Sequence, residues 1–282
     1  MAERRSMLDC NVRYAAGLMR ALLGAMIFAL PMLMTMEMWQ LGATMSPFRL
    51  AVLLVLTFPA LVGLSFYAGF EATFSVTDNV LDAFAAIAVA AAASCAVLWL
   101  FGEIGPATPF QETVGKLAVM SFAASIGALL ADKQFNDQPD EPDDRRDEGY
   151  QRGLVSRLFV MGVGAIFLAL NVAPTDEIAA IASNISPWQA AILCVASFAA
   201  LHVILRVADP EAKRMFGGDL VRRSLAGYGV CLALCGFILW CFGRFDGMAF
   251  DECVECIIVL AFPASLGAGA AHLILGGGED GG

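Results

Sequence analysis

The sequence predicts an all-α polytopic membrane protein with eight transmembrane helices, arranged as two tandem four-helix repeats. Hydrophobic residues make up 59% of the 282 residues and charged residues only 16%, with a mean hydropathy of +0.72. Soluble domains contain roughly 45–50% apolar residues, so a water-soluble enzyme is excluded. Runs such as Ala21 to Met36 and Leu50 to Phe70 carry no charge and are typical of membrane spans.

Each predicted span is an apolar run bounded by charge and long enough to cross a ~30 Å hydrocarbon core as a helix. The eight spans are residues 17–39, 47–70, 81–102, 113–131, 156–173, 187–206, 224–243 and 252–275. The apolar run of the first span follows four arginines, as in a signal peptide, but this run is too long and no clear cleavage site follows. It is therefore predicted to be a retained span.

The positions of Lys and Arg predict the orientation. Fourteen of the seventeen basic residues lie at the N-terminus, after the fourth span or after the sixth, and only Arg49, Lys116 and Arg244 lie on the opposite side. Cytoplasmic loops carry the excess of basic residues, which places both termini in the cytoplasm. We expect a multi-pass protein of the inner (plasma) membrane.

An internal repeat relates the two halves of the chain. Aligning residues 24–61 with 164–201 gives fourteen identities in thirty-eight positions, among them a Glu and a Ser-Pro pair that composition alone would not align. The match resumes with Leu98-Trp99 against Leu239-Trp240. Units with an even number of spans have the same orientation, so a pseudo-two-fold axis along the membrane normal is expected, as in transporters built from parallel repeats.

The acidic segment between the repeats is predicted to be a cytoplasmic linker. Eight acids lie between Asp132 and Glu148, a composition typical of a solvated, largely disordered segment. A calcium site is the alternative, but the segment lacks EF-hand spacing. The predicted organisation is a cytoplasmic N-terminus (1–16), first repeat (17–131), acidic linker (132–156), second repeat (157–275) and flexible tail (276–282).

Short motifs point to a family. The first span contains a proline and ends in Thr35-x-Glu37-x-Trp39, and its partner reads Ala173-Pro174-Thr175-Asp176-Glu177. Together with the two-half plan, these motifs resemble an uncharacterised family of bacterial integral membrane proteins. The resemblance covers nearly the full length and implies an architecture, with no established activity.

Glu37 and Glu177 lie at equivalent positions near the predicted outer ends of the first and fifth spans. A carboxylate there is costly unless it faces the protein interior, water or a cation; the alternative is an interfacial residue wetted by headgroups. Pro31 and Pro174 predict bent or broken helices, with a new short helix after Pro174 and freed carbonyls that could coordinate a cation. The cation-binding candidates are Glu37, Glu177, Thr35, Thr175, Asp176 and Asn171.

Acidic residues outnumber basic residues on the predicted outer side by nine to three, with Glu37, Asp176 and Glu177 among the nine. If they converge, they form a negative mouth that concentrates cations. Attraction to the N-terminal dipole of the last span explains Asp251 and Glu252 without a ligand. The outer-mouth acids beyond the candidates above are Glu103, Glu112, Asp246, Asp251, Glu252 and Glu255.

The eight cysteines and two histidines do not predict a cofactor. Cys253 and Cys256 have C-x-x-C spacing, but no second pair or nearby His completes a four-ligand metal site. A disulfide between Cys241 and Cys253 is left open, because its geometry cannot be read from sequence. His202 and His272, near the inner ends of their spans, favour snorkelling polar groups over a bis-His haem.

The leading hypothesis is a transport protein for a small cation, with a secondary carrier preferred to a channel because paired broken helices suit alternating access. The first rival is a non-transporting scaffold or accessory subunit whose acidic linker docks a cytoplasmic partner. An intramembrane enzyme is disfavoured, because the spans contain no nucleophile–base pair. The expected partners are the lipid bilayer and a small cation of open identity, with homo-oligomerisation left open and no nucleic acid.

Overall fold

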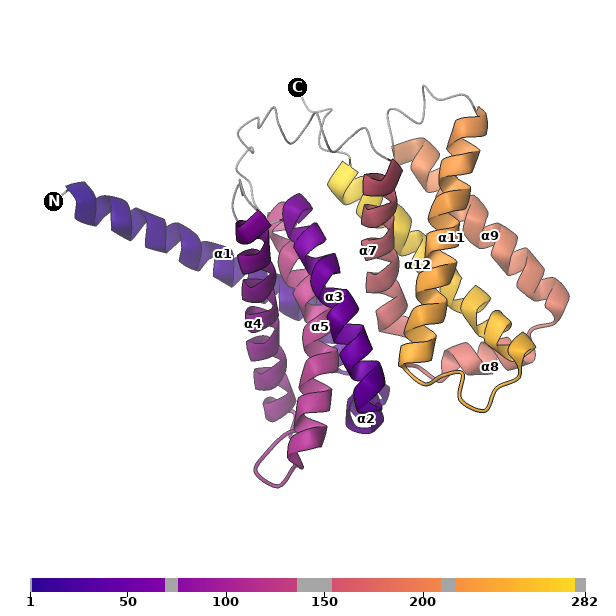
Figure 1. Ribbon diagram of the computed structural model, residues 1–282, viewed down its shortest axis with the longest axis horizontal. Coiled ribbons are helices and arrows are strands. Elements are labelled where there is room, and N and C mark those ends of the chain that lie inside the picture. The colour runs from indigo at the N-terminus through magenta and orange to yellow at the C-terminus, as the bar shows by residue number, and fades with distance from the viewer. Residues whose placement is uncertain (1, 69–75, 136–153, 209–216, 277–282) are drawn as a thin grey trace. The chain divides into compact units, whose positions relative to one another are not determined.

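The structure, a computed structural model, describes residues 2–68, 76–135, 154–208 and 217–276, and every regular element within them is an α-helix (Figure 1). The predicted all-α class is confirmed. Contacts divide the chain into two compact units, unit 1 (Met1–Pro139) and unit 2 (Asp140–Gly282). Most of the predicted acidic linker and of the predicted tail lies outside the described residues.

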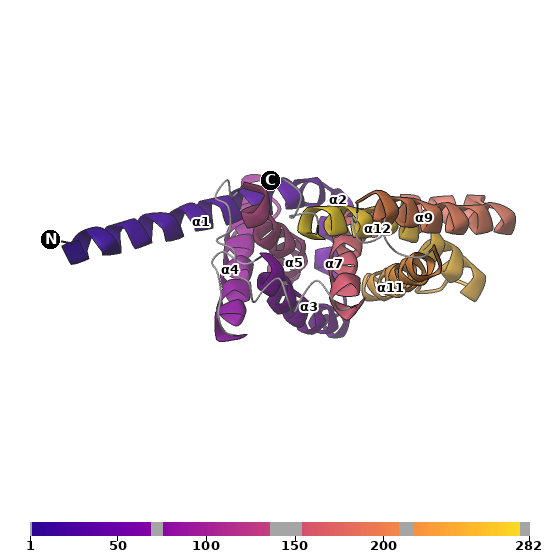
Figure 2. The ribbon, with the colours of Figure 1, turned by 90° about the horizontal axis from the view of Figure 1, so that it is seen from above.

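Unit 1 is built around one central helix. Its elements are α1 (Ala2–Leu33), α2 (Met36–Thr44), α3 (Pro47–Ala68), α4 (Val76–Leu100) and α5 (Phe110–Phe135). α5 packs against all four others, and Figures 1 and 2 both draw α3 and α4 beside it. Ala123, Ala124 and Ala128 of α5 are fully buried, because small side chains let neighbouring helix backbones approach closely.

Unit 2 has the same order of long and short helices. Its elements are α7 (Leu154–Val172), α8 (Glu177–Asn184), α9 (Pro187–Ala208), α11 (Gly217–Cys241) and α12 (Phe250–Gly276). Here α12 is central and packs against the other four. Its contact with α7 is made backbone to backbone, since a Cβ added to Gly267 would collide with the carbonyl oxygen of Gly164.

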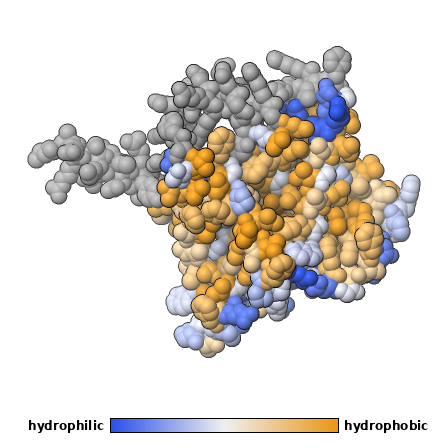
Figure 3. Space-filling view, in the orientation of Figure 1, coloured by the Kyte–Doolittle hydropathy of each residue, from blue (hydrophilic) through white to orange (hydrophobic). Residues whose placement is uncertain are grey.

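Seven of these helices are long and apolar enough to cross a membrane: α3, α4, α5, α7, α9, α11 and α12. In α1 the described apolar stretch is only Gly17–Ile27. The first span predicted over residues 17–39 is divided between two helices, because α1 ends at Leu33 and α2 begins at Met36. Large apolar side chains such as Val55 and Val195 are exposed, and Figure 3 shows an apolar surface that suits hydrocarbon rather than water.

The loops that lead into the two central helices begin with the same turn. Gly102 and Gly243 follow α4 and α11 with φ of +79° and +72°, the left-handed region that favours glycine. The next backbone N–H donates to the carbonyl five residues earlier in both cases, at 2.9 Å. These residues are Glu103 in unit 1 and Arg244 in unit 2. We call this end of each unit, which also carries α2 or α8, its loop end.

Candidate functional site

The first long helix of each unit stops in the same way at the loop end. Thr35 Oγ1 donates to the Met32 carbonyl and Thr175 Oγ1 to the Val172 carbonyl, each at 2.8 Å. The backbone N–H groups of the two threonines donate to the same carbonyls at 3.2 and 3.0 Å. These bonds close the last turn and allow a new helix to start. The short helix predicted after Pro174 is confirmed as α8.

The end of α7 contains one buried oxygen without a hydrogen-bond partner and one carbonyl that lacks the usual helical donor four residues later. Asn171 Nδ2 donates to the Phe167 carbonyl at 2.8 Å, while Asn171 Oδ1 is buried and has no hydrogen-bond partner within the described part of the chain. Pro174 has no N–H to offer to the Leu170 carbonyl four residues earlier. A buried acceptor without a donor costs about 1–3 kcal/mol, and each such atom requires an explanation such as a bound water or ion.

The two carboxylates singled out from the sequence lie at the starts of the short helices. Glu37 is half-buried in the first turn of α2, and Glu177 is exposed as the first residue of α8. Neither makes a hydrogen bond or ion pair with another described residue. A helix N-terminus stabilises nearby negative charge, so both carboxylates lie where the helix dipole favours them.

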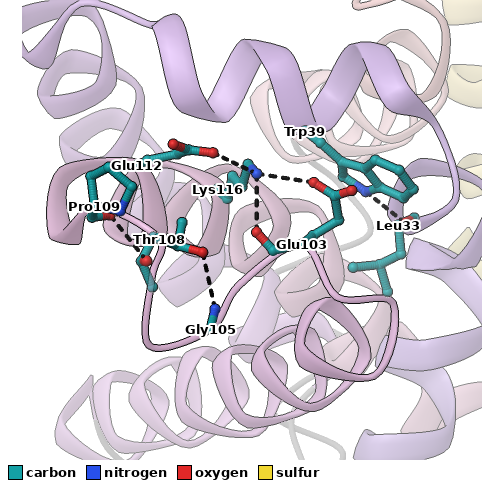
Figure 4. A network of polar contacts seen from close by, with 9 residues as sticks. Leu33, Trp39, Glu103, Gly105, Thr108, Pro109, Glu112 and Lys116 are labelled. Atoms are coloured by element: carbon teal, nitrogen blue, oxygen red, sulfur yellow. Dashed lines mark hydrogen bonds and ion pairs between the residues drawn. The ribbon is translucent and has the colours of Figure 1, made fainter.

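Figure 4 shows a polar cluster that sequence reasoning missed, formed by Lys116 with Glu103 and Glu112. Lys116 is only 6% exposed although it lies in a membrane-spanning helix. Its Nζ is 3.0 Å from Glu103 Oε2, 3.1 Å from the Glu103 carbonyl and 2.8 Å from Glu112 Oε1. All three ammonium protons are therefore used. A Glu four residues before a Lys inside an apolar run was the signal that could have found it.

Helix α2 covers this cluster. Trp39 Nε1 donates to the Leu33 carbonyl at 2.8 Å, which ties α2 to the end of α1 (Figure 4). Gly42 lies directly on the α5 backbone, and a Cβ added there would lie 2.5 Å from the Lys116 Cα. Only glycine fits this contact without a shift of the backbone.

The loop end of unit 2 has a different charge pattern. The repeat alignment places Arg244 at the position of Glu103, and after a one-residue slip it continues with Phe250 at the position of Phe110 and Cys256 at that of Lys116. Arg244 Nη1 donates to Asp176 Oδ1 at 2.8 Å. Glu252 Oε2 accepts the Ala249 backbone N–H at 3.1 Å, a helix-capping contact that supports the explanation of this acid without a ligand.

The acids predicted to form an outer mouth thus differ in their interactions. Glu103, Glu112 and Asp176 are paired with basic side chains, and Glu252 caps α12. Asp246 is exposed in the α11–α12 loop, and Asp251 and Glu255 lie in the first turns of α12. Four of the nine predicted outer acids are therefore already engaged by groups of their own unit.

Cysteine and histidine side chains form no centre of their own in the described residues. Cys231 and Cys235 are buried in α11, and Cys241 and Cys253 are thiols with no disulfide between them. His202 Nδ1 lies 2.9 Å from Ser224 Oγ. In the described ranges, no group of three or more His, Cys, Asp or Glu residues is placed to hold a metal ion.

Comparison with known proteins gives one match. The model of a family described as "Putative integral membrane protein (DUF2391)" matches residues 17–275. No curated protein and no solved structure matches the chain.

Proposed function

The chain belongs to this family of integral membrane proteins, and from that premise we propose that it carries a small cation across the membrane. The observation that supports the proposal most is that Asn171 Oδ1, at the end of α7, is buried and has no hydrogen-bond partner among the described residues. Amide and backbone carbonyl oxygens are ligands that hard cations prefer. Broken helices in transporters place such oxygens at coupling-ion sites.

The site would combine oxygens from the α7–α8 break. Asn171 Oδ1 and the Leu170 carbonyl would coordinate the ion, and Glu177 at the start of α8 would supply charge. In unit 1, Thr35 and Glu37 are the corresponding side chains. The hydroxyls of Thr35 and Thr175 donate hydrogen bonds to backbone carbonyls, so their oxygen lone pairs would still be able to coordinate an ion. A secondary carrier is preferred to a channel, because such paired breaks suit alternating access.

We further propose that α1 is an eighth span and that the two units are parallel repeats related by a pseudo-two-fold axis along the membrane normal. The shared helix order, the shared central helix and the matching turns after α4 and α11 support this relation. In this arrangement both termini and the acidic linker would be cytoplasmic, with the loop ends outside.

Reporter fusions test the topology. A cytoplasmic reporter fused after Gly282, or inserted between Pro139 and Asp140, is expected to be active, because fourteen of seventeen basic residues lie on that side. A reporter inserted at Asp246 in the α11–α12 loop is the matched control and should be inactive. A periplasmic result at Gly282 would contradict the proposed orientation.

Ion flux in liposomes tests the function. Asn171→Leu is expected to reduce cation flux roughly tenfold or more, which corresponds to at least about 1.4 kcal/mol of lost ion binding. Its thermal stability should be unchanged or higher, because the substitution removes a buried acceptor that has no donor. Glu37→Gln and Glu177→Gln should also reduce flux while the protein stays folded, since Gln cannot neutralise the ion.

Matched variants separate binding from fold effects. Asn184 in α8 makes the same type of bond, from Nδ2 to the Ala180 carbonyl at 2.7 Å, but is exposed, so Asn184→Leu should leave flux unchanged. Asp251→Asn should weaken flux only at low salt, because Asp251 is exposed and exposed charges are screened within about 8 Å at 0.15 M. If the parent carries no cation, or if folded Asn171→Leu and Glu177→Gln carry it normally, transport is refuted and the scaffold becomes the better account.

A further inference from the structure

Unit 1 contains an apolar groove of about 340 Å³ between α3, α4 and α5. It reaches the surface beside Leu54 and Val114, which are 39% and 42% exposed. An engineered apolar cavity of about 150 Å³ stays dry and holds a molecule the size of benzene. A space more than twice as large is therefore suited to an apolar ligand of substantial size.

The polar side chains of the groove have no hydrogen-bond donor left for a ligand. Thr57, Ser121 and Ser125 line it, and each hydroxyl donates to a carbonyl of its own helix, at 2.6, 2.6 and 2.7 Å. With these donors used and no charged side chain among the lining residues, the wall recognises hydrocarbon.

The dimensions favour a chain rather than a compact solute. The lining residues of α5 run from Val114 to Ser125, a distance of about 16 Å at 1.5 Å per residue. This is close to half of the ~30 Å hydrocarbon core, the depth that one lipid leaflet fills. The mouth of the groove is continuous with the apolar surface of α3, where Val55 and Leu56 are exposed.

Unit 2 carries larger side chains at three of the corresponding positions. In the repeat alignment, Tyr228 takes the place of Ile87, Leu232 that of Ala91 and Ile258 that of Ala118. Tyr228 is buried, and its hydroxyl lies 3.4 Å from Cys194 Sγ, at the position of Leu54. The same helix plan therefore accommodates larger side chains at these positions than unit 1 has.

We propose that the groove between α3, α4 and α5 binds one acyl chain of a bilayer phospholipid, from the leaflet at the loop end of unit 1. The groove is a slot for lipid on the apolar surface of unit 1, and the small side chains of Ala91 and Ala118 leave room for it. The proposal does not depend on cation transport, because an inert scaffold would keep the same slot.

A photoreactive lipid tests the proposal. The purified full chain is reconstituted into vesicles of phosphatidylethanolamine and phosphatidylglycerol that contain a phospholipid with a diazirine in its acyl chain, and cross-linked peptides are measured by mass spectrometry. For the parent, cross-links should concentrate on α3, α4 and α5 residues of the groove. The variant Ala91→Leu/Ala118→Ile introduces the larger residues of unit 2. In this variant the yield of groove cross-links should fall roughly tenfold, which corresponds to about 1.4 kcal/mol of lost binding free energy.

Ala92→Leu is the matched control, because Ala92 is exposed on the same helix outside the groove lining, and its cross-links should equal those of the parent. If the filled variant does not fold, Leu54→Cys/Ile87→Tyr introduces the Tyr–Cys pair of unit 2 and should cause the same loss. Equal yields in parent and filled variants would overturn the proposal. Cross-links spread evenly over all lipid-facing helices, or a groove occupied by another protein segment, would also overturn it.

Discussion

Lys116→Met is expected to lower the thermal unfolding midpoint by roughly 6–12 °C. The substitution leaves Glu103 and Glu112 without their shared cation, and breaking a buried ion pair from one side costs 3–5 kcal/mol. Because the two carboxylates are 27% and 33% exposed, solvent screens part of this loss. We therefore expect a loss of about 3 kcal/mol in the free energy of unfolding. For a chain of this size, each kcal/mol shifts the unfolding midpoint by about 2–4 °C.

The measurement is thermal unfolding of the purified protein in detergent. The triple variant Glu103→Gln/Glu112→Gln/Lys116→Met is the control, because replacing all members of a buried charge cluster by neutral groups removes the uncompensated charge. It should recover most of the lost stability. A midpoint for Lys116→Met within 2 °C of the parent would show that the cluster contributes little, since that shift corresponds to only about 0.5–1 kcal/mol.

Gly267→Leu is expected to disrupt unit 2. A Cβ at this position would collide with the Gly164 carbonyl oxygen, and backbone cannot move aside as a flexible side chain can. Overpacking typically costs 1–3 kcal/mol, and we expect about 3 kcal/mol or more because the contact is between two helix backbones. Loss of a monodisperse peak on size exclusion, or a lower unfolding midpoint, would report it.

The same substitution at Gly229 gives the comparison. Gly229 is exposed on α11, and no atom lies within 4 Å of a Cβ added there. Leucine is a better helix former than glycine by up to about 1 kcal/mol, so Gly229→Leu should be neutral or stabilising. Equal behaviour of the two variants would show that the α7–α12 contact tolerates side chains.

Much of the fold follows from hydropathy alone. The predicted spans 47–70 and 187–206 correspond closely to α3 and α9, because Ser-Pro starts both helices and apolar residues fill them. Helix α8 was also predictable, since Pro174 and the acids after it are typical of a helix start. Helix α2 was missed because the sequence around Met36 to Gly42 continues the apolar run of α1. Its separation depends on hydrogen bonds of Thr35 and Trp39 that hydropathy does not encode.

The candidate site was predictable only in part. Asn171, Thr175 and Glu177 could be placed at a helix break from Pro174 and the repeat, but the bare Oδ1 of Asn171 depends on burial that only three-dimensional packing provides. The pairing of Lys116 with Glu103 spans thirteen residues and a loop, so its geometry depends on the turn at Gly102. A count of charges by side could not distinguish paired from accessible carboxylates.

The Lys116 cluster also bears on how the chain enters the membrane during synthesis. On translocon scales a lysine at the centre of a spanning helix raises the insertion free energy by about 2.5–3.5 kcal/mol, which is an upper bound for Lys116 in the second turn of α5. Its partners are Glu112, on the same helix, and Glu103, in the loop that joins α4 to α5. The α4–α5 hairpin therefore brings its own neutralising groups and can leave the translocon as one unit. Arg244 pairs instead with Asp176, sixty-eight residues earlier, so the α11–α12 hairpin completes its charge balance only against helices already inserted.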